Sequence, residues 1–260
     1  MDLHLHGKTA IVTGASRGIG LAAARVLAEE GVRVAGISRR GSAELKECGA
    51  VEVNADLSTA DGARSAVENA LDALGGADVL VNNAGGGEDY VLGGFLESDE
   101  ESWRRIFEMN FFSAVRVTRA ALPSLLERRG CVVNVSTVGA RMPLSGPIEY
   151  NTSKAALTVF GKALSKEFGP RGLRVNTVSP GPVRTAIWEA PDGFGAQLAA
   201  ASGVTLEEFL AALPARLGVT TGRMADPREV GALIAFLASD HAANITGSDH
   251  LIEGGMVKTV

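Results

Sequence analysis

Residues 9–20 read TAIVTGASRGIG, an apolar run rich in β-branched residues that passes directly into a turn containing three glycines. The next eleven residues, LAAARVLAEEG, have helical spacing and end in a glycine. Between a strand and a helix, glycines let the backbone turn tightly and approach a pyrophosphate at the helix N-terminus. The stretch therefore predicts a dinucleotide-binding βα unit, although its spacing GxxxGxG differs from the common GxGxxG. The loop residues expected at the cofactor are Gly14, Ser16, Arg17, Gly18, Ile19 and Gly20.

The same turn also fits a different motif. Residues 14–18, GASRG, match the GxSxG nucleophile elbow of α/β-hydrolases, in which Ser16 would be the nucleophile. That alternative needs a histidine downstream, and His241 and His250 are the candidates. Because an elbow usually follows several strands and this turn follows the first, the dinucleotide interpretation is preferred.

Short apolar runs closed by turn residues recur along the chain and predict strands buried on both faces. The runs are TAIVTG, VRVAGIS, AVEVNA, ADVLVNNAG, GCVVNVS, LRVNTVS and DHLIEGG. Helical patterns separate them, among them residues 59–73, 101–128 and 150–168, with Pro123 as an expected kink near the end of the second. This alternation predicts a single α/β domain over residues 1–260, a doubly wound, Rossmann-like parallel sheet with helices on both faces. Its ligand should lie across the carboxyl ends of the strands.

One long segment interrupts the alternation. Residues 184–222 contain two prolines, several glycines and Ala/Leu-rich helical patches, which is too long for an ordinary connection between a strand and a helix. We expect a mobile lid at 186–218 that covers the substrate, with a packed structural decoration as the alternative. Trp188, Phe194 and Phe209 are expected to form its apolar roof.

Composition limits the classes of function. The chain has 260 residues, 46% of them hydrophobic, which suits a globular domain with a well-buried core. A net charge of −5 with 5% aromatic residues argues against a nucleic-acid partner. Two cysteines provide no disulfide framework or thiolate metal cluster, and a metal role for His4 and His6 is not expected. The chain shows no signal-peptide pattern and no apolar run near the about 18–20 residues of a membrane span, so we expect a cytoplasmic protein with no membrane partner.

The second predicted strand bears on the choice of dinucleotide. An NAD site would place Asp or Glu at its end to bind the ribose hydroxyls, whereas VRVAGIS is followed by Arg39 and Arg40 after Ser38. A guanidinium suits the 2′-phosphate of NADP(H) through charge-assisted hydrogen bonds. NADP(H) is therefore the favoured cofactor, and NAD(H) remains possible.

Residues 149–154, EYNTSK, place Tyr150 and Lys154 one helical turn apart in a chain with only two tyrosines. Side chains at i and i+4 share a helix face, so the lysine charge would favour the phenolate and lower the phenol pKa. A tyrosine of this kind can exchange protons near neutral pH, which general acid–base catalysis requires.

Together these motifs resemble the short-chain dehydrogenase/reductase family, in its shorter branch of about 250 residues, over nearly the whole chain. The resembling elements, in family order, are TGASRGIG, ADLS at 55–58, NNAG at 82–85, EMN at 108–110, NVST at 134–137, YNTSK, PGPVRT at 180–185, RMADPREV at 223–230, NITG and EGG. The resemblance implies that Tyr150 is the general acid in carbonyl reduction and that Lys154 lowers its pKa and binds the nicotinamide ribose. It also implies that Asn110 holds a water that links the lysine to solvent.

The resemblance implies further cofactor contacts. Asp56 and Leu57 would contact the adenine, and Asn83, Ala84 and Gly85 would pass close to the cofactor. The nicotinamide side would be lined by Pro180, Gly181, Val183 and Thr185.

One position departs from the family pattern. The catalytic serine commonly lies 13 residues before the tyrosine, and here that position is Thr137, with Ser136 beside it. Neighbours on a strand point to opposite faces, so only one hydroxyl can face a substrate. We expect Thr137 to be the catalytic hydroxyl, with Ser136 as the alternative.

The sequence thus predicts an NADP(H)-dependent oxidoreductase that interconverts a ketone and a secondary alcohol, with an apolar small-molecule substrate. The alternatives are an NAD-preferring alcohol dehydrogenase of the same family and a non-catalytic protein that senses NADPH. A homodimer or homotetramer is expected, because family members commonly pair the helices that correspond to 101–128 and 150–168.

Overall fold

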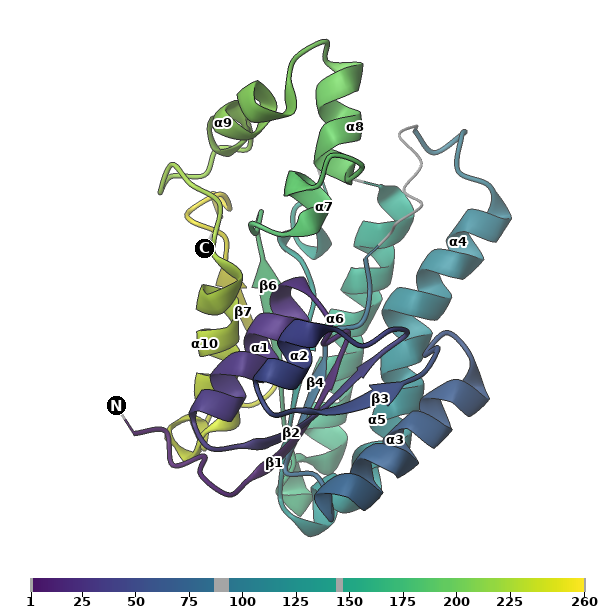
Figure 1. Cartoon of the computed structure of the whole chain (residues 1–260), viewed down its shortest axis with the longest axis vertical. Helices are drawn as coiled ribbons and strands as arrows, with labels where there is room; N and C mark the ends of the chain where they lie inside the picture. The colour runs from purple at the N-terminus through teal and green to yellow at the C-terminus, as the bar shows by residue number, and fades with distance from the viewer. Residues whose placement is uncertain (1, 87–93, 144–146, 260) are drawn as a thin grey trace.

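The computed structural model describes residues 2–86, 94–143 and 147–259 (Figure 1). Its centre is a seven-stranded parallel sheet in the order β3-β2-β1-β4-β5-β6-β7. The strands are β1 Thr9–Thr13, β2 Arg33–Ser38, β3 Val51–Asn54, β4 Val79–Asn82, β5 Cys131–Val135, β6 Arg174–Pro180 and β7 Asp249–Ile252. Each strand coincides with one of the seven apolar runs, so the predicted parallel α/β sheet is confirmed.

Helices cover both faces of the sheet (Figure 1). On one face lie α1 (Gly18–Glu29), α2 (Ala43–Glu47) and α10 (Pro227–Ala238), and on the other α3 (Ala60–Leu74), α5 (Ser113–Glu127) and α6 (Ile148–Phe168). The chain leaves β1 toward β2 and β3, then returns to the other side of β1 with β4. Polar loops at the carboxyl ends of β1 and β4 therefore meet at a topological switch point, where doubly wound sheets bind their ligands.

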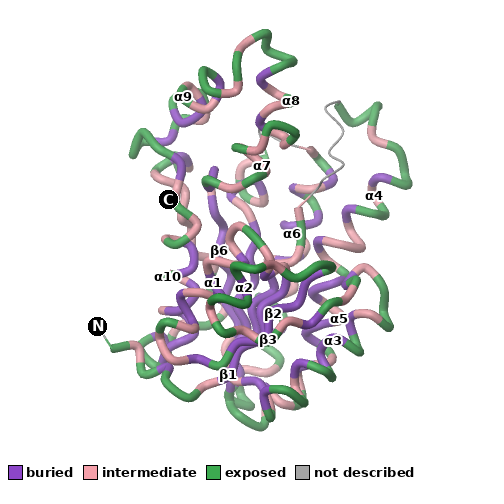
Figure 2. The backbone as a smooth tube through the Cα atoms, viewed as in Figure 1, coloured by how far each residue is buried: buried purple, intermediate pink, exposed green. Residues whose placement is uncertain are grey.

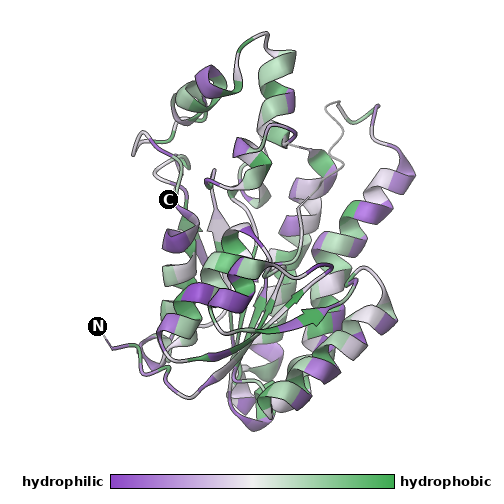
Figure 3. Ribbon diagram, viewed as in Figure 1, coloured by the Kyte–Doolittle hydropathy of each residue, from purple (hydrophilic) through white to green (hydrophobic). Residues whose placement is uncertain are grey.

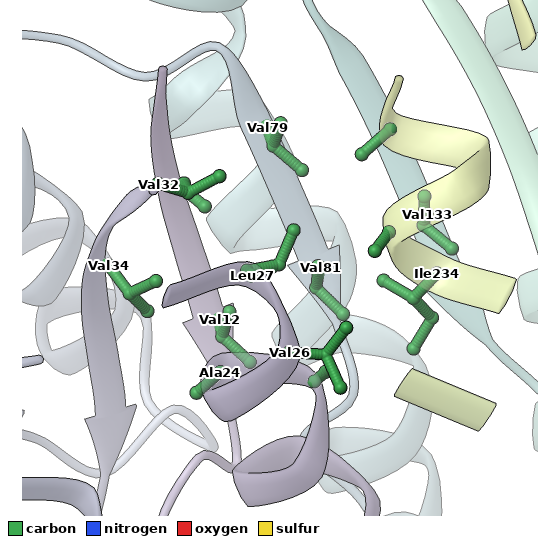
Figure 4. Close-up of a cluster of buried hydrophobic side chains, with 14 of the residues drawn as sticks. Val12, Ala24, Val26, Leu27, Val32, Val34, Val79, Val81, Val133 and Ile234 are labelled. Atoms are coloured by element: carbon green, nitrogen blue, oxygen red, sulfur yellow. The ribbon is translucent and has the colours of Figure 1, made fainter. Parts of the chain in front are cut away.

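Adjacent residues of a strand point to opposite faces of the sheet, so two neighbouring apolar residues contribute to the two cores that lie on its two faces. Val12, Val81 and Val133 face α1 and α10, where they cluster with Leu27 and Ile234 (Figure 4). Their neighbours Ile11, Leu80 and Val132 face the other way and cluster with Val67 of α3, Leu125 of α5 and Leu164 of α6. Figures 2 and 3 show the strands as the most buried and among the most hydrophobic parts of the fold.

The predicted helix over 101–128 is interrupted. The structure has α4 at Glu100–Phe107, then a π-helical turn at Glu108–Phe112, then α5. The irregular turn therefore lies at EMNFF, well before Pro123, which sits inside α5. Single π-helical turns occur frequently at functional sites.

The insertion after β6 folds as three short helices, α7 (Ala186–Glu189), α8 (Phe194–Ala201) and α9 (Leu206–Arg216), which project beyond the carboxyl ends of the strands (Figure 1). Phe209 is 5% exposed and packs with Ala199, Leu213 and Met224 in a small core of the insertion's own. The expectation that Phe209 forms a roof over the substrate is therefore wrong, because its ring is used inside the insertion. Trp188 and Phe194 form an edge-to-face pair with centroids 5.9 Å apart.

Within the described ranges, no single helix has both the length and the apolar composition to cross a membrane. The bent pair Ala186–Ala201 and Leu206–Arg216, with a 75° break, meets the same criteria by length and composition alone.

Candidate active site

The glycine-rich loop after β1 has the conformation that its sequence predicts. Gly14 and Gly18 have φ of +66° and +57°, where residues with a Cβ are strained. A Cβ on Gly20 would overlap the Gly14 carbonyl oxygen and Nδ2 of Asn83. The loop can therefore approach a ligand closely only because these positions carry no side chain.

Asn83 and Ala84 of the NNAG segment are bound to this loop through Thr13. The Thr13 hydroxyl accepts hydrogen bonds from the backbone N–H groups of Asn83 and Ala84, at 3.0 and 2.9 Å, and donates to the Val81 carbonyl. Asn83 Nδ2 donates to the Thr13 carbonyl at 3.0 Å. Thr13 was not among the predicted site residues, although a hydroxyl directly before the first glycine was the available signal.

The N-terminus of α1 opens at this loop. The N-cap residue of α1 is Arg17, and within the described residues its side chain does not cap the helix. The first turn, GIGL, carries no acidic residue. Thr185, from the loop after β6, lies over Gly18, since a Cβ there would be 3.3 Å from the threonine methyl group. A helix N-terminus with exposed N–H groups attracts a phosphate. These residues fit the pyrophosphate of a dinucleotide.

The ends of β2 and β3 form the other extremity of the site. Ser38 is buried and its hydroxyl donates to the Arg40 carbonyl at 2.7 Å, while Arg39 is exposed. Hydrogen bonds from the Ser58 hydroxyl and amide lower the pKa of Asp56, and the positive charge of Arg39 lowers it further. Leu57 is 3% exposed and packs in the core beside them.

Lys154, Asn110 and Gly85 converge where β4 and β5 end. Lys154 is 3% exposed, and its Nζ donates to the Val135 carbonyl at 2.8 Å. Burial lowers the pKa of Lys154 from 10.5 to about 8. A Cβ on Gly85, whose φ is +155°, would lie 2.6 Å from Asn110 Oδ1 and 3.1 Å from Lys154 Nζ. Tyr150 lies in the first turn of α6, four residues before the lysine.

Asn110 is fully buried in the π-helical turn and its side chain is held at both ends. Its Oδ1 accepts from the Gly86 amide at 2.9 Å, and its Nδ2 donates to the Ile106 carbonyl at 2.9 Å. Gly86 thus belongs to the site although sequence reasoning did not select it. Its position directly after NNAG was the only signal.

The two neighbouring hydroxyls after β5 have different surroundings. Ser136 is 4% exposed, and its Oγ donates to the Lys154 carbonyl at 3.0 Å and lies 2.9 Å from the Thr158 hydroxyl, both on α6. Thr137 is half-buried, and its Oγ1 accepts a long hydrogen bond, 3.3 Å, from the Gly139 amide. The Ser136 hydroxyl is therefore engaged by α6, whereas in the contacts among the described residues the Thr137 hydroxyl acts as an acceptor.

The loop after β6 closes the site from the opposite side. The Gly181 amide donates to the Ile252 carbonyl at 3.0 Å, and Val183, 4% exposed, pairs with Ala225 through an isolated parallel bridge. The Thr185 hydroxyl donates to the Val183 carbonyl at 3.3 Å. Pro180 is the last residue of β6, so these four residues follow one strand end onto the same edge of the sheet as the glycine-rich loop.

The hydrolase alternative does not match this arrangement. His250 lies on β7, four strands from β1, which is about 19 Å at the usual spacing of strands. The His241 ring lies against His4, 5.4 Å between centroids, and its Nε2 lies 2.7 Å from the Asp2 carbonyl. Neither histidine is placed to activate Ser16.

The fold and site define a dinucleotide-binding oxidoreductase of the doubly wound class. A family profile described as enoyl-(acyl carrier protein) reductase matches residues 14–257. The chain is 36% identical to a 3-oxoacyl-[acyl-carrier-protein] reductase of Vibrio cholerae, over 98% of this chain and 99% of that one. It is 37% identical to the oxidoreductase UcpA of Salmonella typhimurium, over 96% and 95% of the two chains. The structure of L-sorbose reductase from Gluconobacter frateurii, complexed with NADPH and L-sorbose, covers both chains completely with a TM-score of 0.90 and 32% identity.

The chain belongs to the short-chain dehydrogenase/reductase family. The resemblance inferred from its motifs is thereby confirmed. The protein is accordingly an oxidoreductase of a family that uses a nicotinamide cofactor.

Proposed function

We propose that the protein is an NADP(H)-dependent ketoreductase that interconverts an apolar ketone and a secondary alcohol. The observation that carries the proposal is the buried Lys154, held by the Val135 carbonyl beside Asn110 and one helical turn from Tyr150. Burying a lysine is unfavourable, so a fold that keeps one at the carboxyl ends of its strands needs a compensating use for it.

The cofactor supplies or accepts the hydride, and the chain's residues manage the substrate oxygen and its proton. The Thr137 hydroxyl would donate a hydrogen bond to the carbonyl oxygen and orient it. Tyr150 would then transfer its phenolic proton to that oxygen. At neutral pH most Lys154 side chains still carry a charge, because their pKa is about 8, and this charge stabilises the phenolate that remains. Asn110, whose side-chain amide is engaged by Gly86 and Ile106, would hold the water that returns a proton to the lysine.

The preference for NADP(H) is supported by the side chains at the end of β2. Arg39 lies near enough to Asp56 to lower its pKa, so its charge is directed at the extremity of the site where an adenine ribose would lie. A 2′-phosphate placed there would meet this guanidinium. The NADPH bound to the Gluconobacter frateurii reductase is consistent with the same preference here.

A homo-oligomer formed through α4, α5 and α6 is also proposed. Ile148 and Val159 of α6 and Phe112 of the π-helical turn between α4 and α5 are 48%, 69% and 41% exposed. Exposed large apolar residues gathered on neighbouring helices are characteristic of subunit contacts.

The test is steady-state kinetics of Tyr150→Phe and the wild type with NADPH and a panel of ketones. The panel should include apolar ketones, 3-oxoacyl thioesters and ketose sugars. We expect the variant to lose about 10²–10⁴ in kcat while its affinity for NADPH changes only a few-fold. Wild-type rates in the variant would refute the assigned acid. NADPH binding without turnover of any substrate by the wild type would instead indicate a sensor.

A further inference from the structure

Arg116 of α5 contacts two parts of the molecule that are far apart in the sequence. Its Nη1 donates to the Ser58 carbonyl at 2.7 Å and lies 2.6 Å from Glu108 Oε2. Its guanidinium carbon lies 5.6 Å from the centroid of the Phe112 ring. The Glu108 contact is an ion pair without a directed hydrogen bond, since Glu108 Oε2 has no hydrogen-bond partner within the part of the chain that the structure describes.

On one side, Arg116 holds the segment that carries Asp56. The amide and the hydroxyl of Ser58 donate to Asp56 Oδ1 at 2.9 and 2.7 Å, and the Ser58 carbonyl accepts from Arg116. Ser58 is therefore fixed between a carboxylate and a guanidinium. Asp56 in turn lies within the field of Arg39. Arg116 thus helps to hold the segment that carries the proposed adenine contacts.

On the other side, Arg116 contacts the first and last residues of the π-helical turn, Glu108 and Phe112. A π-helical turn is rare and is retained where surrounding contacts stabilise it. This turn carries Asn110, whose side chain holds the Gly86 amide beside Lys154. The ion pair and the cation–π contact therefore stabilise the turn from which Asn110 reaches the reacting end of the site.

We propose that Arg116 is a positioning residue that couples the adenine end of the cofactor site to the π-helical turn carrying Asn110. The inference rests on the proposed function for the placement of the cofactor. The adenosine portion would contact the segment that carries Asp56 and Ser58. The Ser58 carbonyl accepts a hydrogen bond from Arg116, and Arg116 in turn contacts Glu108 and Phe112. Because coupling between two sites is reciprocal, binding of the nicotinamide portion must strengthen binding of the adenosine portion by the same factor.

The test divides the cofactor into two pieces. Reduced nicotinamide mononucleotide serves as hydride donor, and adenosine 2′-monophosphate is added as the separate adenine piece. In the wild type we expect the adenine piece to lower the KM for the mononucleotide or raise kcat. In Arg116→Met we expect the affinity for adenosine 2′-monophosphate to fall by about tenfold, as for a lost charge-assisted hydrogen bond. We also expect that adenosine 2′-monophosphate no longer stimulates the reaction of the mononucleotide.

Three further variants separate coupling from folding. Arg119→Met removes an exposed arginine of the same helix. It should leave unchanged both the affinity for adenosine 2′-monophosphate and the stimulation of the mononucleotide reaction. Glu108→Gln should retain the affinity for adenosine 2′-monophosphate but reduce the stimulation, because it weakens only the contact to the π-helical turn. Arg116→Lys keeps a donor for Ser58 without the planar fork, so it should restore affinity more than stimulation. If Arg116→Met does not fold, Glu108→Gln and Arg116→Lys carry the test.

The outcomes distinguish the two proposals. If the wild type does not turn over NADPH with any ketone, the proposed function fails. If it does, but the adenine piece does not stimulate the mononucleotide reaction, the coupling is wrong. The coupling is equally wrong if Arg116→Met behaves like Arg119→Met in both measurements.

Discussion

Replacing Lys154 with methionine should change how stability depends on pH. The folded protein holds this lysine with a pKa of about 8, lowered by burial from the ordinary 10.5. Between these two values the unfolded chain binds more protons than the folded one, so the free energy of unfolding rises with pH. In the wild type this contribution is absent below about pH 7 and grows to about 2 kcal/mol by about pH 9.5. Lys154→Met lacks it.

The difference in the free energy of unfolding at a single pH is less decisive than the way in which that difference changes with pH. At neutral pH the buried charge costs about 3 kcal/mol relative to a neutral side chain. The methionine variant escapes this cost but leaves the Val135 carbonyl without its donor, a loss of about 1–3 kcal/mol. The two nearly cancel, so the variant should be about as stable as the wild type at neutral pH and become the less stable protein as pH rises.

The assay is urea unfolding followed by tryptophan fluorescence at several values between about pH 6.5 and about pH 9.5. Lys166→Met, an exposed lysine on the same helix, is the matched control and should run parallel to the wild type at every pH. If the curve of Lys154→Met is also parallel to the wild type, Lys154 does not titrate in this window. The lysine would then not carry the lowered pKa on which the reasoning depends.

The remaining predictions concern the substrate, the cofactor, assembly and the insertion. Thr137→Ala should lower kcat by about 10²-fold, as expected for loss of a hydrogen bond to the reacting oxygen, whereas Ser136→Ala should mainly lower thermal stability. The reverse pattern would make Ser136 the catalytic hydroxyl. Arg39→Glu should shift the ratio of kcat/KM from NADPH toward NADH, and an unchanged ratio would show that another residue reads the phosphate. Val159→Glu should dissociate the oligomer in light scattering, a prediction that fails if the wild type is already monomeric at micromolar concentration. Phe194→Ala should raise KM for bulky ketones more than for small ones, and hydrogen exchange in the insertion should slow when ligand binds; unchanged exchange and selectivity would make the insertion a structural decoration.

The strands were predictable because the sheet is parallel and covered on both faces. Each strand then reads as a continuous apolar run, and the glycines and asparagines that end it lie at the ligand edge. Ile11 and Val12 illustrate this, since adjacent apolar residues serve cores on opposite faces. The glycine-rich turn was predictable for a related reason, because no other residue tolerates both the positive φ of Gly14 and the close approach at Gly20.

The features that sequence did not predict depend on contacts between distant segments. The π-helical turn at 108–112 has ordinary helical spacing, and it is the buried hydrogen bond between Asn110 and Gly86, 24 residues away, that marks it as a distinct site. Strand alternation showed that Ser136 and Thr137 point in opposite directions, but not which faces α6. Only the packing of that helix decides it, through the Lys154 carbonyl. Phe209 likewise lies in an insertion whose own core could not be recognised from an amphipathic pattern alone.

Two energetically unusual features of the described chain lie close together at the carboxyl edge of the sheet. The buried ammonium of Lys154 raises the free energy of the folded state, and the π-helical turn that carries Asn110 is a rare conformation. Gly85 lies between them, since a Cβ there would be 2.6 Å from Asn110 Oδ1 and 3.1 Å from Lys154 Nζ. The central strands beneath them, β1, β4 and β5, are buried along their whole length, and the cores on both faces of the sheet supply the stability that tolerates these features. Lys154→Met removes the buried charge, so it should keep its stability at neutral pH while losing turnover. If Lys154→Met kept both its stability and its turnover, the buried lysine would have no catalytic use, and the assignment of this edge as the reacting end would be wrong.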